Sequence, residues 1–259
     1  MATNDFTSVS ELSGYRVTQE QIARMYTRYR FAADLCVGRD VLEVACGSGQ
    51  GLGLLAKRAK SVVGGDFDPA IVALAQKHYG DRIPVKQMDA HSIPFADQSL
   101  DAVILFEAIY YLQDPLLFFR ECKRVLRKGG ILVIGSANKE WPGFNPSPFS
   151  HTYFSAQELS GRLKNEGFDV EIFADCPVQR DGWQKKAVGW IKEVAVRFHL
   201  MPKTMKGKEI LKRIFMGRLQ PLPSELKEGM LVYSSPTPLP IGVPVNDFKV
   251  LFAVGRKSE

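Results

Sequence analysis

Val41-Leu-Glu-Val-Ala-Cys-Gly-Ser-Gly-Gln-Gly51 is the stretch that decides the fold of this chain, because an apolar run ends there in a turn with three glycines. Glycine lets a backbone turn sharply and leaves its amide groups open to a ligand. The apolar run predicts a buried strand, and the residues that follow Gly51 predict a helix. Many nucleotide-binding turns share this pattern, so the turn alone indicates a ligand site without identifying the ligand.

Glu43 is an acid near the end of the first expected strand, and two further acids stand at the ends of the next two strands. Val62-Val-Gly-Gly-Asp66 ends the second strand with a carboxylate that can accept two hydrogen bonds from the hydroxyls of a ribose. Asp89 ends the third strand, and Leu100 begins a fourth. The three acidic strand ends together indicate a nucleotide-like ligand at the carboxyl edge of a sheet.

The rest of the chain alternates short apolar runs with helical periods, which is typical of a parallel sheet with helices on both faces. The runs lack strict alternation, as expected for strands buried on both sides. The expected strands are 41–45, 61–66, 83–88, 100–106, 130–137, 168–174 and 247–255. The expected helices are one that begins at a Thr18 and Gln21 capping box, then 51–59, 69–79, 115–126 and 156–165, the last capped by Ser155 and Glu158.

Composition places the chain among ordinary globular proteins, with 45% hydrophobic and 24% charged residues. The four cysteines lack the close spacing of a metal or redox site, so free thiols are expected and no metal is predicted. The N-terminus lacks the basic start and apolar run of a secretory signal, and no apolar stretch approaches the roughly 18 residues that span a bilayer. We expect a soluble, cytoplasmic protein.

A basic segment dominates the net charge of +6. From residue 179 to residue 218, eleven Lys or Arg stand against three acids, and prolines recur from Pro221 to Pro244. We therefore expect a main domain over 1–175 and 247–259, with 176–246 as a basic and proline-rich insertion that acts as a lid or substrate-binding elaboration. Its charges suit an acidic or phosphorylated substrate, or a membrane surface contacted through 183–218.

The ordered motifs resemble those of class I S-adenosylmethionine-dependent methyltransferases of the small-molecule type. The resemblance implies an α/β fold with a doubly wound, mostly parallel seven-stranded sheet, helices on both faces, an antiparallel last strand and an insertion before it. It also implies a cofactor set of Glu43 at the methionine amino group, Gly47 and Gly49 along the methionyl part, Asp66 on the ribose, Phe67, Asp89 and Ala90 at the adenine, and Phe106 near the sulfonium. Position 45 departs from the family pattern, with alanine in place of the usual glycine. That change is tolerated if the backbone there has a negative φ.

Methyl transfer from a sulfonium is an in-line displacement, so holding the acceptor in line supplies much of the acceleration. A hydroxyl acceptor also profits from a base on the loops after the strands. The candidates are Glu107, Tyr110, Tyr111 and His151. We favour His151, because residues 138–150 read as an irregular active-site loop in front of a capped helix. The acceptor is expected to be an oxygen or nitrogen of a sugar, a lipid-linked compound or another metabolite.

Three alternatives stay open on the sequence. A nicotinamide-dependent oxidoreductase shares part of the glycine pattern, but Leu52 stands where its third glycine belongs. A nucleic-acid methyltransferase would use the basic segment, but Phe106-Glu-Ala-Ile-Tyr110 replaces the Pro-Pro-Tyr type loop of amino-methylating DNA enzymes, and a Pro-Cys nucleophile is missing. A binding or regulatory protein that kept the fold and lost activity is the third.

Overall fold

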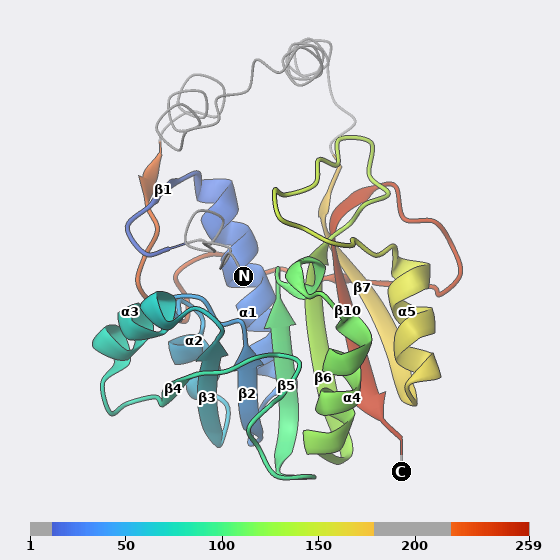
Figure 1. The fold of residues 1–259 in the computed structure, drawn as a ribbon. Helices are drawn as coiled ribbons and strands as arrows, with labels where there is room; N and C mark the ends of the chain where they lie inside the picture. Colours follow the sequence, from blue (N-terminus) through green and yellow to red (C-terminus); the bar gives the residue numbers. More distant parts are fainter. Residues whose placement is uncertain (1–11, 179–218, 259) are drawn as a thin grey trace.

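An eight-stranded sheet with helices on both faces is the main body of the computed structural model, which describes residues 12–178 and 219–258 (Figure 1). The strand order is β4-β3-β2-β5-β6-β10-β7-β9, and β10 and β9 run antiparallel to the other strands. The strands are β2 (Asp40–Val44), β3 (Ser61–Asp66), β4 (Val85–Gln87), β5 (Leu100–Phe106), β6 (Leu126–Ala137), β7 (Phe168–Pro177), β9 (Thr237–Leu239) and β10 (Phe248–Lys257). A separate two-stranded ladder pairs β1 (Arg16–Val17) with β8 (Gln220–Pro221).

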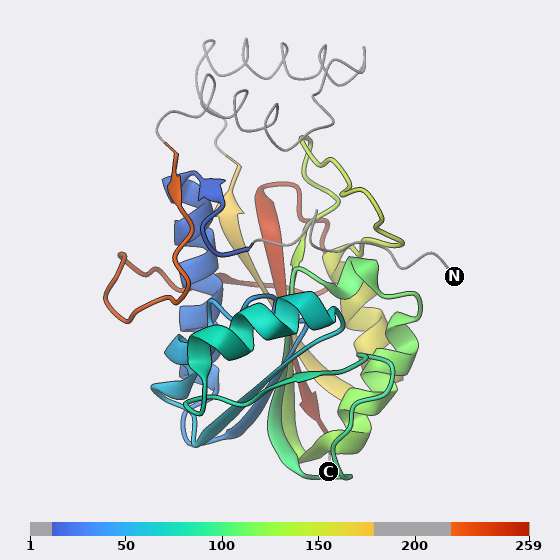
Figure 2. The same cartoon turned by 60° about the vertical axis from the view of Figure 1, so that its left-hand side comes forward.

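Helices α1 (Gln19–Leu35), α2 (Leu52–Ala56) and α3 (Pro69–Tyr79) share one hydrophobic cluster with the sheet. Helices α4 (Pro115–Val125) and α5 (Ala156–Asn165) and the 3₁₀ turn η2 (Ile109–Tyr111) share the other. The two groups lie on opposite sides of the sheet (Figure 2). Along β2, Val41 and Leu42 point into different clusters, which is the alternation that a strand buried on both faces requires.

Local capping sets where most of these helices begin. Thr18 and Ser155 each form a capping box with the residue three positions on, as expected. Asp68 and Asp114 each accept two backbone amides, and a proline follows each of them at the first helical position. These signals are short-range, and the predicted starts of the helices agree with the observed ones to within a residue.

The predicted elements differ from the observed ones mainly at their ends. Helix α2 stops at Ala56, although the glycine-rich turn predicts a helix to residue 59, because Lys60 N–H donates to Arg39 O and turns the chain back toward β3. Three short strands are additions to the predicted ones: β1 and β8, which pair with each other, and β9 beside β7. β9 lies where the proline-rich stretch predicts only extended loop. Pro238 fits there because an edge strand does not need every N–H group.

Part of the predicted insertion packs on the main domain. Leu222 and Leu226 are buried in the cluster of α1 to α3, and Glu225 Oε2 accepts from His78 Nε2 at 2.8 Å and from Arg82 at 3.0 Å. Leu226 N–H donates to Gln50 O in the glycine-rich turn at 2.8 Å. The division at 176–246 remains a prediction, and its basic part, with the membrane contact expected at 183–218, lies outside the described residues.

Free cysteines agree with the prediction from their spacing: Cys36, Cys46, Cys122 and Cys176 form no disulfide. In the parts of the chain that the structure describes, no helix has the length and apolar character needed to cross a membrane.

Candidate functional site

The strand order reverses between β2 and β5, which lie side by side in parallel while their continuations run to opposite edges of the sheet. In open α/β sheets, ligands bind beyond the carboxyl ends of the strands at such a switch point. Glu43 on β2 and Glu107 directly after β5 flank this point. The predicted cofactor and acceptor residues therefore converge on one edge.

In the glycine-rich turn, every second residue from Ala45 to Gly49 has a left-handed backbone with a positive φ. Gly47 has a φ of +59° and Gly49 a φ of +84°, values at which glycine is the favoured residue. Ala45 has a φ of +55°, so the condition of a negative φ, under which alanine would be harmless there, is not met. The alanine is strained, because a left-handed residue with a Cβ costs about 1–2 kcal/mol.

Glu43 is the most deeply buried acid at this edge, with 0% exposure. Its Oε1 accepts from the hydroxyl of Tyr29 at 2.6 Å, while its Oε2 is buried and has no hydrogen-bond partner among the described residues. Burial raises the pKa of Glu43 to about 8, and the Tyr29 hydrogen bond and the charge of Arg28 partly oppose that rise. A buried carboxyl oxygen without a partner is suited to a cationic ligand group.

Asp66 supports the turn from the end of β3. Its Oδ2 accepts from Gly47 N–H at 2.9 Å and its Oδ1 from Asp68 N–H at 3.1 Å. Burial raises the pKa of Asp66, and the same backbone amides oppose the rise. A carboxylate has about four acceptor positions, so acceptor capacity remains for ligand hydroxyls.

The predicted adenine side is more open. Phe67 is 55% exposed, whereas Ala90 is buried. Asp89 Oδ1 accepts from His91 twice, from its backbone N–H at 2.8 Å and from its ring Nδ1 at 2.7 Å. His91 Nε2 in turn accepts from Asp114 N–H at 3.3 Å, so the neutral ring carries its proton on Nδ1 and donates it to Asp89.

His91 contacts the predicted residue Asp89 and was not among the residues predicted from the sequence. Its position two residues after Asp89 is a signal that could have identified it, because an Asp side chain often bonds the backbone two residues on.

The four catalytic candidates meet where the loop after β5 touches the loop after β6. Tyr110 Oη–H donates to Glu107 Oε2 at 2.9 Å, and His151 N–H donates to Tyr110 O at 2.7 Å. Tyr111 Oη lies 2.6 Å from Ser147 Oγ in the second loop. Residues 138–155 contain no helix or strand, in line with the irregular loop predicted there.

Burial and charge distinguish the members of this group. Burial and the Glu107 carboxylate raise the pKa of Tyr110 well above its ordinary value, so its phenol stays protonated at neutral pH. Glu107 has a φ of +52°, and Arg28 of α1 lies 4.0 Å from its Oε1. His151 is exposed, and its ring makes no hydrogen bond to any described residue. Of the four candidates, His151 is the one whose side chain is exposed.

Helix α1 is the second feature that the sequence analysis missed. Its consecutive residues Arg28 and Tyr29 reach Glu107 and Glu43, one on each side of the switch point. Tyr29 lies on the buried face of this helix with Ile22, Met25 and Tyr26. Nothing in a helical stripe shows that a tyrosine hydroxyl ends on a buried acid.

Comparisons with known proteins show what the chain is similar to. Residues 42–134 match the family described as a methyltransferase domain. A probable S-adenosylmethionine-dependent methyltransferase of Mycolicibacterium smegmatis is 38% identical over 147 residues, which cover 55% of this chain and 57% of that protein. A ubiquinone biosynthesis O-methyltransferase of Cereibacter sphaeroides is 28% identical over 66% of this chain and 74% of its own length. The chain spans a little over half the length of the first of these relatives.

A solved structure extends the likeness in fold. A SAM-dependent methyltransferase from Archaeoglobus fulgidus superposes with a TM-score of 0.59 at 18% identity, over 92% of this chain and 97% of that one. The resemblance stated from the motifs is confirmed, and so is the predicted fold class, with β9 as an added edge strand.

Proposed function

We propose that this chain, which carries a class I methyltransferase domain, transfers a methyl group from S-adenosylmethionine to a small-molecule acceptor. The observation that carries the proposal is the arrangement at the switch point. Beside the glycine-rich turn, Glu43 has a buried oxygen without a partner among the described residues, and the end of neighbouring β5 presents Glu107. A cationic cofactor and an acceptor can meet between such adjacent strand ends.

The cofactor supplies an electrophilic methyl group on a sulfonium. Glu43 would pair with the ammonium of its methionyl part, beside the amides of Gly47 and Gly49. Asp66, oriented by two backbone amides, would accept from the ribose hydroxyls. Phe67, Asp89 and Ala90 would hold the adenine, and Phe106, which is buried at the end of β5, would lie near the sulfonium.

The residues on the loops after β5 and β6 would hold the acceptor in line and receive its proton. Tyr110 donates to Glu107 and, as a protonated phenol, keeps that side chain in place. The exposed His151 imidazole would accept the proton of an acceptor hydroxyl. Tyr111, bonded across to Ser147, would form part of the wall that orients the acceptor.

The proposed acceptor class follows from one relative and from the charge of the chain. The similarity to a ubiquinone biosynthesis O-methyltransferase favours an oxygen, or else a nitrogen, on a small metabolite, a sugar or a lipid-linked compound. The basic residues from 179 to 218 suit an acidic or phosphorylated acceptor, and 183–218 would suit a membrane surface. The motifs that nucleic-acid methyltransferases use are missing from the sequence, which argues against a nucleic-acid acceptor.

Calorimetry with S-adenosylhomocysteine and with reduced nicotinamide dinucleotide separates the proposed cofactor from its rival. Binding of the first and not the second is expected. Methyl transfer from radiolabelled cofactor into fractionated metabolite pools then tests turnover. Cofactor binding without transfer to any pool would favour a regulatory protein, and nicotinamide binding alone would overturn the proposal.

A further inference from the structure

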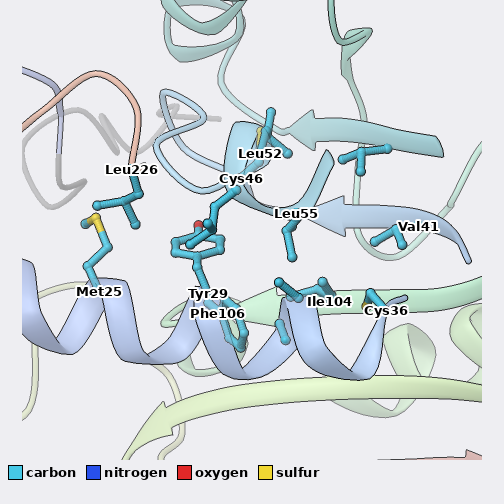
Figure 3. Packing of buried hydrophobic residues seen from close by; sticks show 14 of the residues in the cluster. Met25, Tyr29, Cys36, Val41, Cys46, Leu52, Leu55, Ile104, Phe106 and Leu226 are labelled. Carbon is cyan, nitrogen blue, oxygen red and sulfur yellow. The ribbon is translucent and has the colours of Figure 1, made fainter. Parts of the chain in front are cut away.

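Tyr29 connects helix α1 to the glycine-rich turn and to the ends of the strands (Figure 3). The residue is 4% exposed, and its ring packs edge-on against Phe106 with ring centres 5.2 Å apart. A Cβ added at Gly51 would lie 1.9 Å from a ring carbon of Tyr29. The ring is therefore wedged between the start of α2 and a residue of the proposed cofactor set.

The hydroxyl of Tyr29 has a second contact that packing does not require. It donates to Glu43 Oε1 at 2.6 Å, and this is the only hydrogen bond that the Glu43 carboxyl makes with the described residues. A buried carboxyl with a single partner depends strongly on that partner, because an unsatisfied buried acceptor is costly. The hydroxyl thus determines which of the two carboxyl oxygens is left without a partner.

Among the residues that the structure describes, few charges act on Glu43. Arg28 from α1 favours its ionised form, and Asp66 from β3 opposes it. Burial raises the pKa of each of the other titratable groups that interact with Glu43, so these groups stay neutral near pH 7: Tyr29, Cys36, Cys46 and Tyr79. One added positive group at Oε2 would therefore change the balance at this acid.

We propose that Tyr29 is a positioning residue for the cofactor, whose hydroxyl binds Glu43 Oε1 and so leaves Oε2 for the ammonium group of the methionyl part. The inference rests on the proposed use of S-adenosylmethionine. It assigns the ring and the hydroxyl to different tasks. The ring holds α1 against Gly51 and Phe106, and the hydroxyl orients the acid.

Tyr29→Phe separates the two tasks, because it keeps the ring and removes the hydroxyl. Binding is measured by calorimetry for S-adenosylhomocysteine and for 5′-methylthioadenosine, which shares the adenosine part and lacks the amino-acid part. We expect the affinity for S-adenosylhomocysteine to fall about tenfold, the effect of losing one hydrogen bond to a charged group. The affinity for 5′-methylthioadenosine should change by less than about twofold.

Tyr26→Phe is the matched control. Tyr26 is a buried tyrosine on the same helix, and its hydroxyl accepts from Gly229 N–H at 3.0 Å instead of contacting the site. Its loss should leave the ratio of the two affinities unchanged. A double-mutant cycle adds a second readout: in the background of Glu43→Gln, Tyr29→Phe should have no further effect on S-adenosylhomocysteine.

The outcomes are distinguishable. If the unmodified protein binds neither ligand, the proposed function is overturned together with this inference. If the unmodified protein binds both ligands and Tyr29→Phe weakens both equally or neither, the function stands and the positioning role is overturned. A selective loss for S-adenosylhomocysteine that disappears in the Glu43→Gln background supports it.

Discussion

The carboxyl ends of β2, β3 and β4 and those of β5 and β6 form two halves of one candidate site, and the two halves are built differently. The first half uses backbone amides and buried acids, as in the hydrogen bond from Gly47 N–H to Asp66. The second half uses side chains on loops, with Glu107 and Tyr110 on one and the exposed His151 on the other. Enzymes that use the same cofactor can hold it with the same rigid backbone groups. Their acceptors differ, and loops can differ in sequence and length to fit them.

Helix α1 is the element common to both halves. Tyr29 contacts Glu43 in the first half, and its neighbour Arg28 lies 4.0 Å from Glu107 in the second. Two consecutive residues therefore couple the cofactor half to the acceptor half. Substitutions can show whether the two halves are disabled separately.

The largest expected effect is on turnover in the acceptor half. His151→Ala should lower the turnover number by about a hundredfold or more, the usual contribution of a general base, and should leave the affinity for S-adenosylhomocysteine unchanged. Steady-state kinetics and calorimetry measure the two quantities. His78→Ala is the control, because that imidazole pairs with Glu225 away from the acceptor loops. A fully active His151→Ala variant would eliminate His151 as the base.

In the cofactor half, Asp66→Ala should weaken the binding of S-adenosylhomocysteine by about 2–3 kcal/mol, because it removes charged acceptors for the ribose hydroxyls. Calorimetry measures the loss. Asp68→Ala is the control, because Asp68 caps α3 through two backbone amides and its loss should lower stability by about 1 kcal/mol without a comparable loss of binding. Equal binding losses in both variants would remove Asp66 from the site.

The pH dependence of cofactor binding should belong to the first half alone. The pKa of Glu43 is raised to about 8 without the cofactor, so the acid holds a proton at pH 7, and pairing with an ammonium favours its ionised form. Binding should release a proton, and the affinity should rise with pH up to about 8, by at most about tenfold per pH unit. Calorimetry from pH 6 to pH 8 tests this, and Glu43→Gln should remove the slope.

The same raised pKa affects stability in the opposite sense. The unfolded acid loses its proton near its ordinary pKa of 4.5, while the folded one keeps its proton up to about 8. The cofactor-free protein should therefore lose stability as the pH rises from 4.5 to 8. Denaturant unfolding across that range measures the trend, and a flat profile for the unmodified protein would contradict the buried, protonated acid.

A smaller effect is expected where the first half opens to solvent. His91 donates to Asp89, so His91→Ala should weaken binding of S-adenosylhomocysteine by about 1 kcal/mol. His91→Asn, which retains a donor, should recover part of the loss. The affinity for the inosine counterpart of the ligand, which lacks the exocyclic amine, should change less than that for S-adenosylhomocysteine. An identical loss for both ligands would assign His91 a purely structural role.

The smallest expected effect is on the strained alanine of the turn. Ala45→Gly relieves a left-handed position with a φ of +55°, and the greater freedom of glycine in the unfolded chain partly offsets the gain. Stability should rise by about 0.5 kcal/mol in denaturant unfolding. Gly47→Ala makes the converse change at a φ of +59° and should destabilise the protein. Destabilisation by both changes would show that position 45 prefers its methyl group.

Short-range signals made the fold predictable. Capping residues, prolines at first helical positions and apolar runs act within a few residues of the chain, and they predicted the bounds of α3, β3, β5 and α5 as the structure has them. They predicted other ends less well, as at α2, where a bond from Lys60 to Arg39 beside β2 ends the helix. The ordered acids at the strand ends, with Leu52 in place of a third glycine, likewise pointed to methyl transfer without a structure.

The sequence by itself determined the order of the main strands and helices along the chain, the glycine-rich turn and the resemblance to methyltransferases, because these depend on local patterns and their sequence along the chain. Only the tertiary structure decided what surrounds the acids. The hydroxyl of Tyr29 on Glu43, the approach of Arg28 to Glu107 and the bond from Leu226 to Gln50 join residues that lie far apart in the chain. Such contacts form when a whole helix packs on a sheet, and neither helical spacing nor composition specifies which buried polar atoms then meet.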